Sequence, residues 1–170
     1  KWLFTNFKID LLPNIHIVDR YLASIAPLGV KGDALGLDFF IPEHDEVQNN
    51  WLPETHQNGY IALVIGATYH TKRLPLKRLI ELCDRINQPI ILLGGPEDSG
   101  LGEQIQDFFM EKSTQNLSED DIEFKLGKKA LIFNACGKFN LNQSASLIKK
   151  ARYVFTHDTG LMHIAAAFKK

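Results

Sequence analysis

The sequence has few cysteines, almost no net charge and no long apolar run. Its two cysteines, Cys83 and Cys136, are far apart and lack the spacing of metal ligands. Each lies in an apolar segment, which is typical of a small buried side chain and favours a reducing compartment. The formal net charge is -1, so no global attraction draws the chain to nucleic acid or anionic lipid, and any anion site must be local.

No stretch is long and apolar enough to span a bilayer, and neither a signal peptide nor an internal repeat is visible. The content of 45% hydrophobic and 23% charged residues is typical of a soluble globular protein. The first residue is lysine, and the last four residues continue a helical pattern. We therefore expect both ends to be cuts in a longer protein.

From residue 60 onward, short apolar runs alternate with amphipathic stretches. The runs are apolar on both faces, as in buried parallel strands, and cover residues 60–65, 89–93, 130–135 and 152–156. Apolar side chains at helical spacing fill the intervals and follow the last run, at residues 76–86, 101–109, 141–148 and from 160 onward. This order predicts an α/β fold with a parallel sheet and helices on its faces.

Local signals support two of these helices. Pro75 suits the first turn of one, and Asn140 with Gln143 has the pattern of a capping box for another. Residues 111–128 are polar and predict a surface loop.

Residues 1–58 differ from the rest. They predict a helix at residues 16–26 and fit a short strand at 37–41. We interpret residues 1–58 as the tail of a preceding domain with an interdomain connection, and residues 59–170 as a ligand-binding domain.

Ligands of an open parallel sheet bind beyond the carboxyl ends of its strands, so the residues after each run are the candidates. After the first run, Thr68 offers a hydroxyl, and Lys72 and Arg73 place two positive charges where a helix begins. Because a helix N-terminus is already positive, a diphosphate between these cations would resolve the conflict, although both could be solvated surface residues. After the second run, Glu97 or Asp98 can accept hydrogen bonds from ribose hydroxyls, or can simply cap a helix.

After the fourth run, Thr159 and Gly160 open a helix whose backbone N–H groups can bind a phosphate. Asp158 would repel a phosphate, so it suits a sugar hydroxyl or orients the loop. His163 can donate to a phosphate oxygen, or it is a buried core histidine. Acids and histidines do not cluster as in a metal site, and neither a Walker loop nor a GxGxxG fingerprint is present.

Several segments resemble one family in the expected order. The stretch NLNQSASLIKKARYVFTHDTGLMHIAAA at residues 140–167 closely resembles the signature of the heptosyltransferases. KRLP at 72–75 resembles the KRWP of that family, with Leu74 in place of tryptophan. GGPED at 94–98 and HIVDRYLASIAPLGV at 16–30 resemble further family segments.

The resemblance implies a GT-B architecture of two Rossmann-like domains, of which this chain holds mainly the C-terminal donor-binding domain in truncated form. It implies an inverting transfer of heptose from ADP-heptose to the lipopolysaccharide inner core, with no metal or cofactor. The enzyme would be cytoplasmic, from a Gram-negative bacterium, and in peripheral contact with the inner membrane. The catalytic base would lie in the absent acceptor domain, so this piece alone is expected to be inactive.

The resemblance also assigns roles. Lys72 matches the lysine on the donor diphosphate, and Glu97 or Asp98 matches the acid on the ribose. Asp158, Thr159, Gly160 and His163 match the loop around the phosphates and the sugar. Two alternatives stay open: another GT-B sugar-nucleotide enzyme, such as a different glycosyltransferase or an epimerase, and a module that binds a nucleotide without turnover.

Overall fold

The computed structural model describes residues 2–8, 15–33, 36–111 and 131–170, and the chain divides into two compact units at Gly36. The first unit contains α1 (Trp2–Phe7), α2 (Ile17–Ile25) and the 3-10 helix η1 (Ala26–Leu28). The helical stretch ends at Gly29, whose φ of 79° is favourable for glycine. The predicted helix at residues 16–26 is therefore confirmed.

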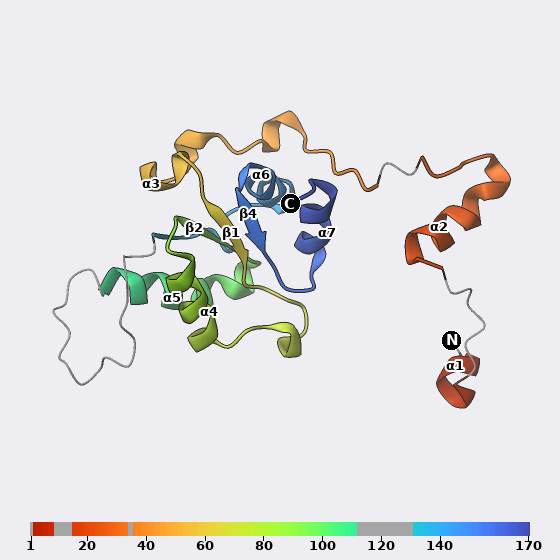
Figure 1. Ribbon diagram of the computed structural model, residues 1–170, viewed down its shortest axis with the longest axis horizontal. Helices are drawn as coiled ribbons and strands as arrows, with labels where there is room; N and C mark the ends of the chain where they lie inside the picture. The colour runs from red at the N-terminus through yellow and green to blue at the C-terminus, as the bar shows by residue number, and fades with distance from the viewer. Residues whose placement is uncertain (1, 9–14, 34–35, 112–130) are drawn as a thin grey trace. The chain divides into compact units, whose positions relative to one another are not determined.

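The second unit is built on a four-stranded, fully parallel sheet with the order β3-β2-β1-β4 (Figure 1). The strands are β1 (Ile61–Val64), β2 (Ile90–Leu93), β3 (Ile132–Asn134) and β4 (Tyr153–Phe155). Each lies inside one of the predicted apolar runs. The predicted α/β fold with a Rossmann-like parallel sheet is confirmed.

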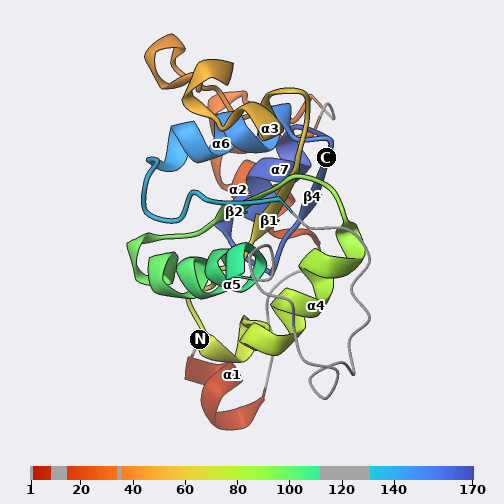
Figure 2. The same cartoon turned by 90° about the vertical axis from the view of Figure 1, so that its left-hand side faces the viewer.

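Two helices cover each face of the sheet (Figure 2). Helices α4 (Leu76–Ile86) and α5 (Ser99–Glu111) pack on one face, and α6 (Leu141–Lys150) and α7 (Gly160–Ala167) pack on the other. The second unit also contains several short helices: η2 (Glu43–Asp45), η3 (Asn49–Trp51), α3 (Glu54–Gln57), η4 (His70–Lys72) and η5 (Pro96–Asp98).

The two central strands send alternate side chains into two separate cores. In β1, Ala62 and Val64 join the core beneath α6 and α7, whereas Leu63 joins the core beneath α4 and α5. Each fully buried aliphatic side chain of this kind contributes about 1.5–3 kcal/mol relative to exposure. Cys83 and Cys136 lie in the second core, where burial raises the pKa of each thiol to about 12. The prediction that both cysteines are buried is confirmed.

The helix boundaries follow local signals. Asn140 caps α6 by accepting from the Gln143 backbone N–H at 2.8 Å, and the Gln143 side chain accepts from the Asn140 N–H at 3.0 Å. This is the predicted capping box. Pro75 is the N-cap of α4, one residue outside the first turn where the sequence placed it.

Three expectations differ from the structure or fall outside it. Residues 37–41 form no strand, because they pair with no neighbour in the described sheet. Tyr153 and Phe155 are 66% and 42% exposed, since β4 has only β1 beside it and no described helix covers that part of the sheet. The predicted polar loop at 111–128 lies outside the described residues beyond Glu111, which ends α5.

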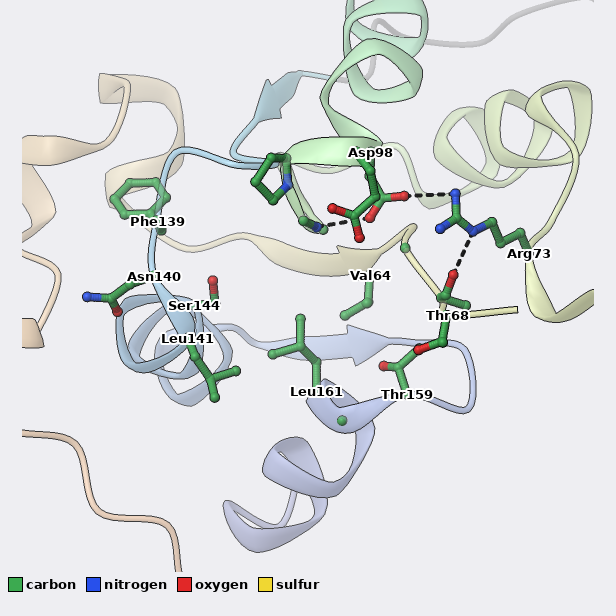
Figure 3. A pocket seen from close by; sticks show the side chains of 17 residues that line it. Val64, Thr68, Arg73, Asp98, Phe139, Asn140, Leu141, Ser144, Thr159 and Leu161 are labelled. Carbon is green, nitrogen blue, oxygen red and sulfur yellow. Dashed lines mark hydrogen bonds and ion pairs between the residues drawn. The ribbon is translucent and has the colours of Figure 1, made fainter. Parts of the chain in front are cut away.

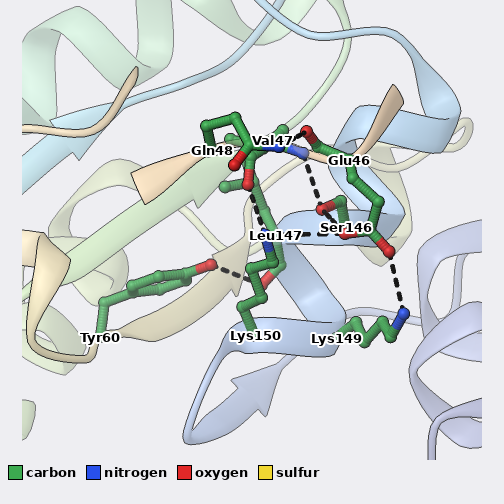
Figure 4. A network of polar contacts seen from close by, with 8 residues as sticks. All are labelled: Glu46, Val47, Gln48, Tyr60, Ser146, Leu147, Lys149 and Lys150. Carbon is green, nitrogen blue, oxygen red and sulfur yellow. Dashed lines mark hydrogen bonds and ion pairs between the residues drawn. The ribbon is translucent and has the colours of Figure 1, made fainter. Parts of the chain in front are cut away.

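The segment before β1 packs on α6 (Figure 4). The backbone N–H of Val47 donates to the buried Ser146 hydroxyl at 3.0 Å, and that hydroxyl donates to Glu46 at 2.9 Å. Lys149 donates to Glu46 at 2.9 Å, and Lys150 donates to the Val47 carbonyl at 2.5 Å. We call residues 45–47 the clasp. They belong to the second compact unit, and the assignment of residues 1–58 to a preceding domain stays a prediction.

A buried histidine, His56, lies at the amino end of β2 and has a defined tautomer. His56 is 2% exposed, and its Nε2 lies 3.1 Å from the Ile90 carbonyl oxygen, which can only accept. Nε2 therefore carries the proton, and Nδ1 accepts from the Thr55 hydroxyl at 2.9 Å. Burial lowers the pKa of His56, so the folded state holds this ring neutral.

This histidine predicts an acid-sensitive stability. The unfolded chain binds a proton at His56 below about pH 6.5, whereas the folded chain binds it only at lower pH, so stability falls as pH decreases. From pH 7 to pH 5 the free energy of unfolding should drop by at most about 2 kcal/mol, the limit for a ring that stays neutral when folded. Urea titrations should show that His56→Gln, which keeps a donor for Ile90, flattens this slope. His44→Gln, at a side chain that is 82% exposed, should retain it.

Candidate functional site

A cleft of about 670 Å³ opens at the carboxyl ends of β1 and β2. The connection from β1 to β2 runs through α4 on one face of the sheet. The connection from β3 to β4 runs through α6 on the other face, so the two helices leave the sheet on opposite faces. A switch of this kind leaves a crevice above the strand ends, where open α/β sheets bind ligands. The loops after β1 and β2 and the starts of α6 and α7 line it.

The cleft has a polar end and an apolar end (Figure 3). Thr68, Arg73 and Thr159 lie at one end. Phe139 and Leu141 lie toward the other, around the start of α6, beside the polar side chains of Asn140 and Ser144. We call it the apolar end after its two large apolar side chains. This arrangement fits an elongated ligand with a flat apolar group at one end and a charged group at the other.

Six of the nine predicted site residues line the cleft: Thr68, Arg73, Glu97, Asp98, Thr159 and Gly160. Lys72 and Asp158 lie beside it, each next in sequence to a lining residue, and they contact one another. His163 is exposed in the first turn of α7 and does not line the cleft. The expectation that the loops after three strands meet at one sheet edge is confirmed, while the ligand contacts of these residues stay predictions.

Lys72 already has an anion beside it. Its Nζ lies 2.5 Å from Oδ2 of Asp158, and the two side chains are 40% and 64% exposed. The hydrogen bond from Lys72, and then its charge, lower the pKa of the Asp158 carboxyl. An ion pair this exposed contributes little to stability and exchanges readily. A phosphate entering the cleft can therefore compete with Asp158 for this lysine.

Glu97 and Asp98 differ sharply in accessibility. Asp98 is 2% exposed, and its Oδ2 accepts from the Gly95 N–H at 2.9 Å. Glu97 is exposed at the cleft and lies against Gly95, where an added Cβ would approach Glu97 Oε2 to 2.4 Å. Glu97 is the carboxylate that an incoming hydroxyl can reach.

The start of α7 is open toward the cleft. Thr159 is the N-cap, but its hydroxyl makes no capping hydrogen bond and its Oγ1 has no partner in the described chain. A Cβ added to Gly160 would meet no protein atom within 4 Å, so packing within the described chain does not require glycine there. Close approach of a ligand to the backbone gives a reason for both features.

The apolar end was missed in the sequence. Phe139 and Leu141 follow β3, the one run after which no candidate site residue was predicted from the sequence. The rule that ligands bind after each parallel strand applies to β3 as well, and applied there it would have found Phe139.

The described residues include neither a candidate metal site nor a candidate membrane span. In that part of the chain, no group of three or more histidines, cysteines and acids could hold a metal ion. Nor does any helix there have the length and apolar character needed to cross a membrane.

Comparisons with known proteins agree with this geometry. The whole chain, residues 1–170, matches the family described as glycosyltransferase family 9 (heptosyltransferase). Lipooligosaccharide heptosyltransferase 2 of Haemophilus influenzae is 34% identical over 93 residues, which cover 55% of this chain and 22% of that protein.

Solved structures share the fold. The glycosyl transferase family 9 structure from Veillonella parvula has a TM-score of 0.63 and 23% identity, and the match covers 94% of this chain and 42% of that one. For the E. coli heptosyltransferase WaaC with ADP the TM-score is 0.59 and the identity 22%, with 99% and 47% covered. The chain thus spans less than half the length of each of these relatives.

The Lys72–Asp158 pair predicts opposite effects of two substitutions on ADP affinity in the full protein. Lys72→Ala should weaken ADP binding roughly 10- to 150-fold, because a charge-assisted contact of about 1.5–3 kcal/mol is lost. Asp158→Asn should tighten it a few fold, because the competing carboxylate charge is gone. Isothermal titration measures both, with adenosine as the phosphate-free control that neither change should affect. Equal loss of ADP and adenosine affinity in Lys72→Ala would contradict the assignment.

Proposed function

Because the chain belongs to glycosyltransferase family 9, the heptosyltransferases, we propose that its cleft binds ADP-heptose for transfer of heptose to the lipopolysaccharide inner core. The observation that carries the proposal is the two-ended cleft, polar beside Lys72 and apolar at Phe139. The E. coli structure that shares the fold contains ADP, a ligand with one flat apolar group and one charged group.

Each part of the donor has a matching part of the cleft. The adenine packs at the apolar end against Phe139 and Leu141. The ribose hydroxyls donate to Glu97, the accessible carboxylate. The diphosphate accepts from Lys72 and from the N–H groups at the start of α7, where the helix dipole favours an anion. Once Lys72 turns to the phosphate, Asp158 is released to accept from a heptose hydroxyl.

The proposed reaction is a direct displacement with inversion. An acceptor hydroxyl attacks the anomeric carbon, its proton passes to a base, and the bond from that carbon to the diphosphate oxygen breaks to release ADP. Lys72 and the start of α7 are the groups of this chain that face the negative charge developing on the diphosphate. His163, in the first turn of α7, does not line the cleft, so its contact with the diphosphate stays a prediction. Oriented donors of this type commonly contribute about 2 to 4 kcal/mol each. We assign no catalytic base among the described residues.

We propose the same setting for the enzyme as the resemblance implies: the cytoplasm of a Gram-negative bacterium, in peripheral contact with the inner membrane. A nucleotide-sugar donor and a lipid-linked core acceptor support this proposal. The displacement needs no metal and no cofactor.

Titration of the full protein with ADP, UDP and GDP tests the proposal. ADP should bind most tightly, and transfer assays with ADP-heptose and other sugar nucleotides should show turnover of the heptose donor. If UDP or GDP bound more tightly than ADP, the protein would be another sugar-nucleotide enzyme. If ADP bound tightly but no sugar were transferred, the protein would be a module that binds a nucleotide without turnover.

Glu97 gives a sharper prediction about the ribose. The native protein should prefer ADP to 2′-deoxy-ADP by roughly tenfold, since a hydrogen bond to a charged acceptor contributes about 1.5 kcal/mol or more. Glu97→Gln should remove most of this preference in competition titrations. Glu103→Gln, which changes an exposed acid on α5, should preserve it. A preference unchanged in Glu97→Gln would refute the ribose assignment.

A further inference from the structure

Arg73 and Asp98 connect two walls of the cleft. Arg73 comes from the loop after β1, and its Nε donates to the carbonyl of Ala67 in the same loop at 2.7 Å. Its Nη1 lies 3.1 Å from Oδ1 of Asp98, which comes from the loop after β2. Asp98 Oδ2 accepts in turn from Gly95 N–H of its own loop at 2.9 Å. Each of the two side chains thus bonds to the backbone of its own loop and forms an ion pair with the side chain from the other loop.

The carboxylate of Asp98 lies beneath the backbone of both loops. A Cβ added to Gly66 would come within 2.1 Å of Asp98 Oδ2, and one added to Gly94 would come within 2.8 Å of the same atom. Both glycines therefore make room for a buried acid at the floor of the cleft. A carboxylate held this way has little freedom to turn toward a ligand.

Neither charged group is available to the donor. Asp98 is 2% exposed, and its Oδ1 has the Arg73 guanidinium as an ion-pair partner but makes no hydrogen bond, so a ribose hydroxyl would have to displace Arg73 to reach it. The Arg73 guanidinium is committed to Ala67 and Asp98, and its side chain is only 30% exposed. A buried carboxylate needs a cation beside it, since its desolvation is otherwise costly.

We propose that Arg73 and Asp98 are positioning residues whose ion pair ties the loop after β1 to the loop after β2, and so sets the spacing between Lys72 and Glu97. The inference rests on the proposed donor site, in which Lys72 holds the diphosphate and Glu97 holds the ribose. Those two side chains are the direct neighbours of Arg73 and Asp98 in sequence. The pair acts on the ligand through them without touching it.

The first test needs no nucleotide. Hydrogen exchange in the full protein should show faster exchange in Arg73→Gln at residues 66–73 and also at residues 94–98, because releasing one loop frees the other. Arg78→Gln is the matched control, since it breaks an exposed ion pair with Glu81 at 2.7 Å on neighbouring α4. Faster exchange confined to residues 66–73 would overturn the proposal, whatever the protein binds.

The second test is a double-mutant cycle on ADP binding. Arg73→Gln and Asp98→Asn should each weaken the binding of ADP roughly 5- to 100-fold. The double variant should bind ADP no less tightly than the single variant that binds it more weakly. Both single variants should weaken the binding of adenosine as well, and both should reduce the preference for ADP over 2′-deoxy-ADP to a similar extent, because Glu97 is displaced together with Lys72. A role confined to folding would lower the melting temperature and leave the affinity of the folded protein unchanged.

Other outcomes separate the rival roles. Additive losses in the double variant would overturn the coupling. Loss of ADP affinity without loss of adenosine affinity in Arg73→Gln would make Arg73 a phosphate ligand. Loss of the 2′-hydroxyl preference in Asp98→Asn, with the preference intact in Arg73→Gln, would make Asp98 the ribose acid. Because Arg73 is partly exposed, its variants should fold, and they provide the test if Asp98→Asn does not fold. Arg73→Lys keeps the positive charge and should therefore bind ADP more tightly than Arg73→Gln does. Failure of the native protein to bind ADP would instead count against the proposed function.

Discussion

The burial of both faces of β1 and β2 is the constraint on which the site depends. Because these strands are parallel and carry apolar side chains on each face, they need helices on both sides, and each connection must cross from the carboxyl end of one strand to the start of the next. All the strand-to-helix loops therefore emerge at one edge. The change of face between α5 and α6 separates those loops and opens the cleft. Residues far apart in sequence meet there as a consequence of apolar burial.

Within the cleft, the charged groups divide by how completely the protein satisfies them. Asp98 is buried and has contacts to both of its oxygens, so it belongs to the framework. Lys72 and Asp158 are exposed partners whose contact is weak, and Thr159 has a hydroxyl without a partner. Groups that hold a fold are paired in a closed environment, whereas groups that bind a ligand need partners they can leave. By this criterion Arg73 belongs with Asp98 and not with its neighbour Lys72.

Much of this could be predicted from the sequence, for identifiable reasons. The strands and helices of residues 60–168 follow from apolar periodicity, and the loop positions follow from the rule for parallel sheets. The pairing of Lys72 with Asp158 could not be predicted, because it joins side chains that are 86 residues apart in the sequence. The same is true of Glu97 and Asp98: adjacent acids look equivalent in a sequence, and only the fold shows that one is buried and the other exposed. The apolar end could not be predicted from charged and hydroxyl side chains, because Phe139 carries neither kind of group.

The clasp links the site to the chain before β1, which was assigned from the sequence to the tail of a preceding domain and its connection. Asp45 is 6% exposed and accepts from the side-chain amides of Asn140 and Asn142 at 2.8 Å each. Asn140 is at once the cap of α6 and a lining residue of the cleft. Its amide is therefore shared between holding the helix start through its oxygen and holding the clasp through its nitrogen. Asp45 therefore ties the chain before β1 to the wall beside Phe139. The apolar end of the cleft is held by contacts with this chain, while its polar end is held by the loops of the sheet itself.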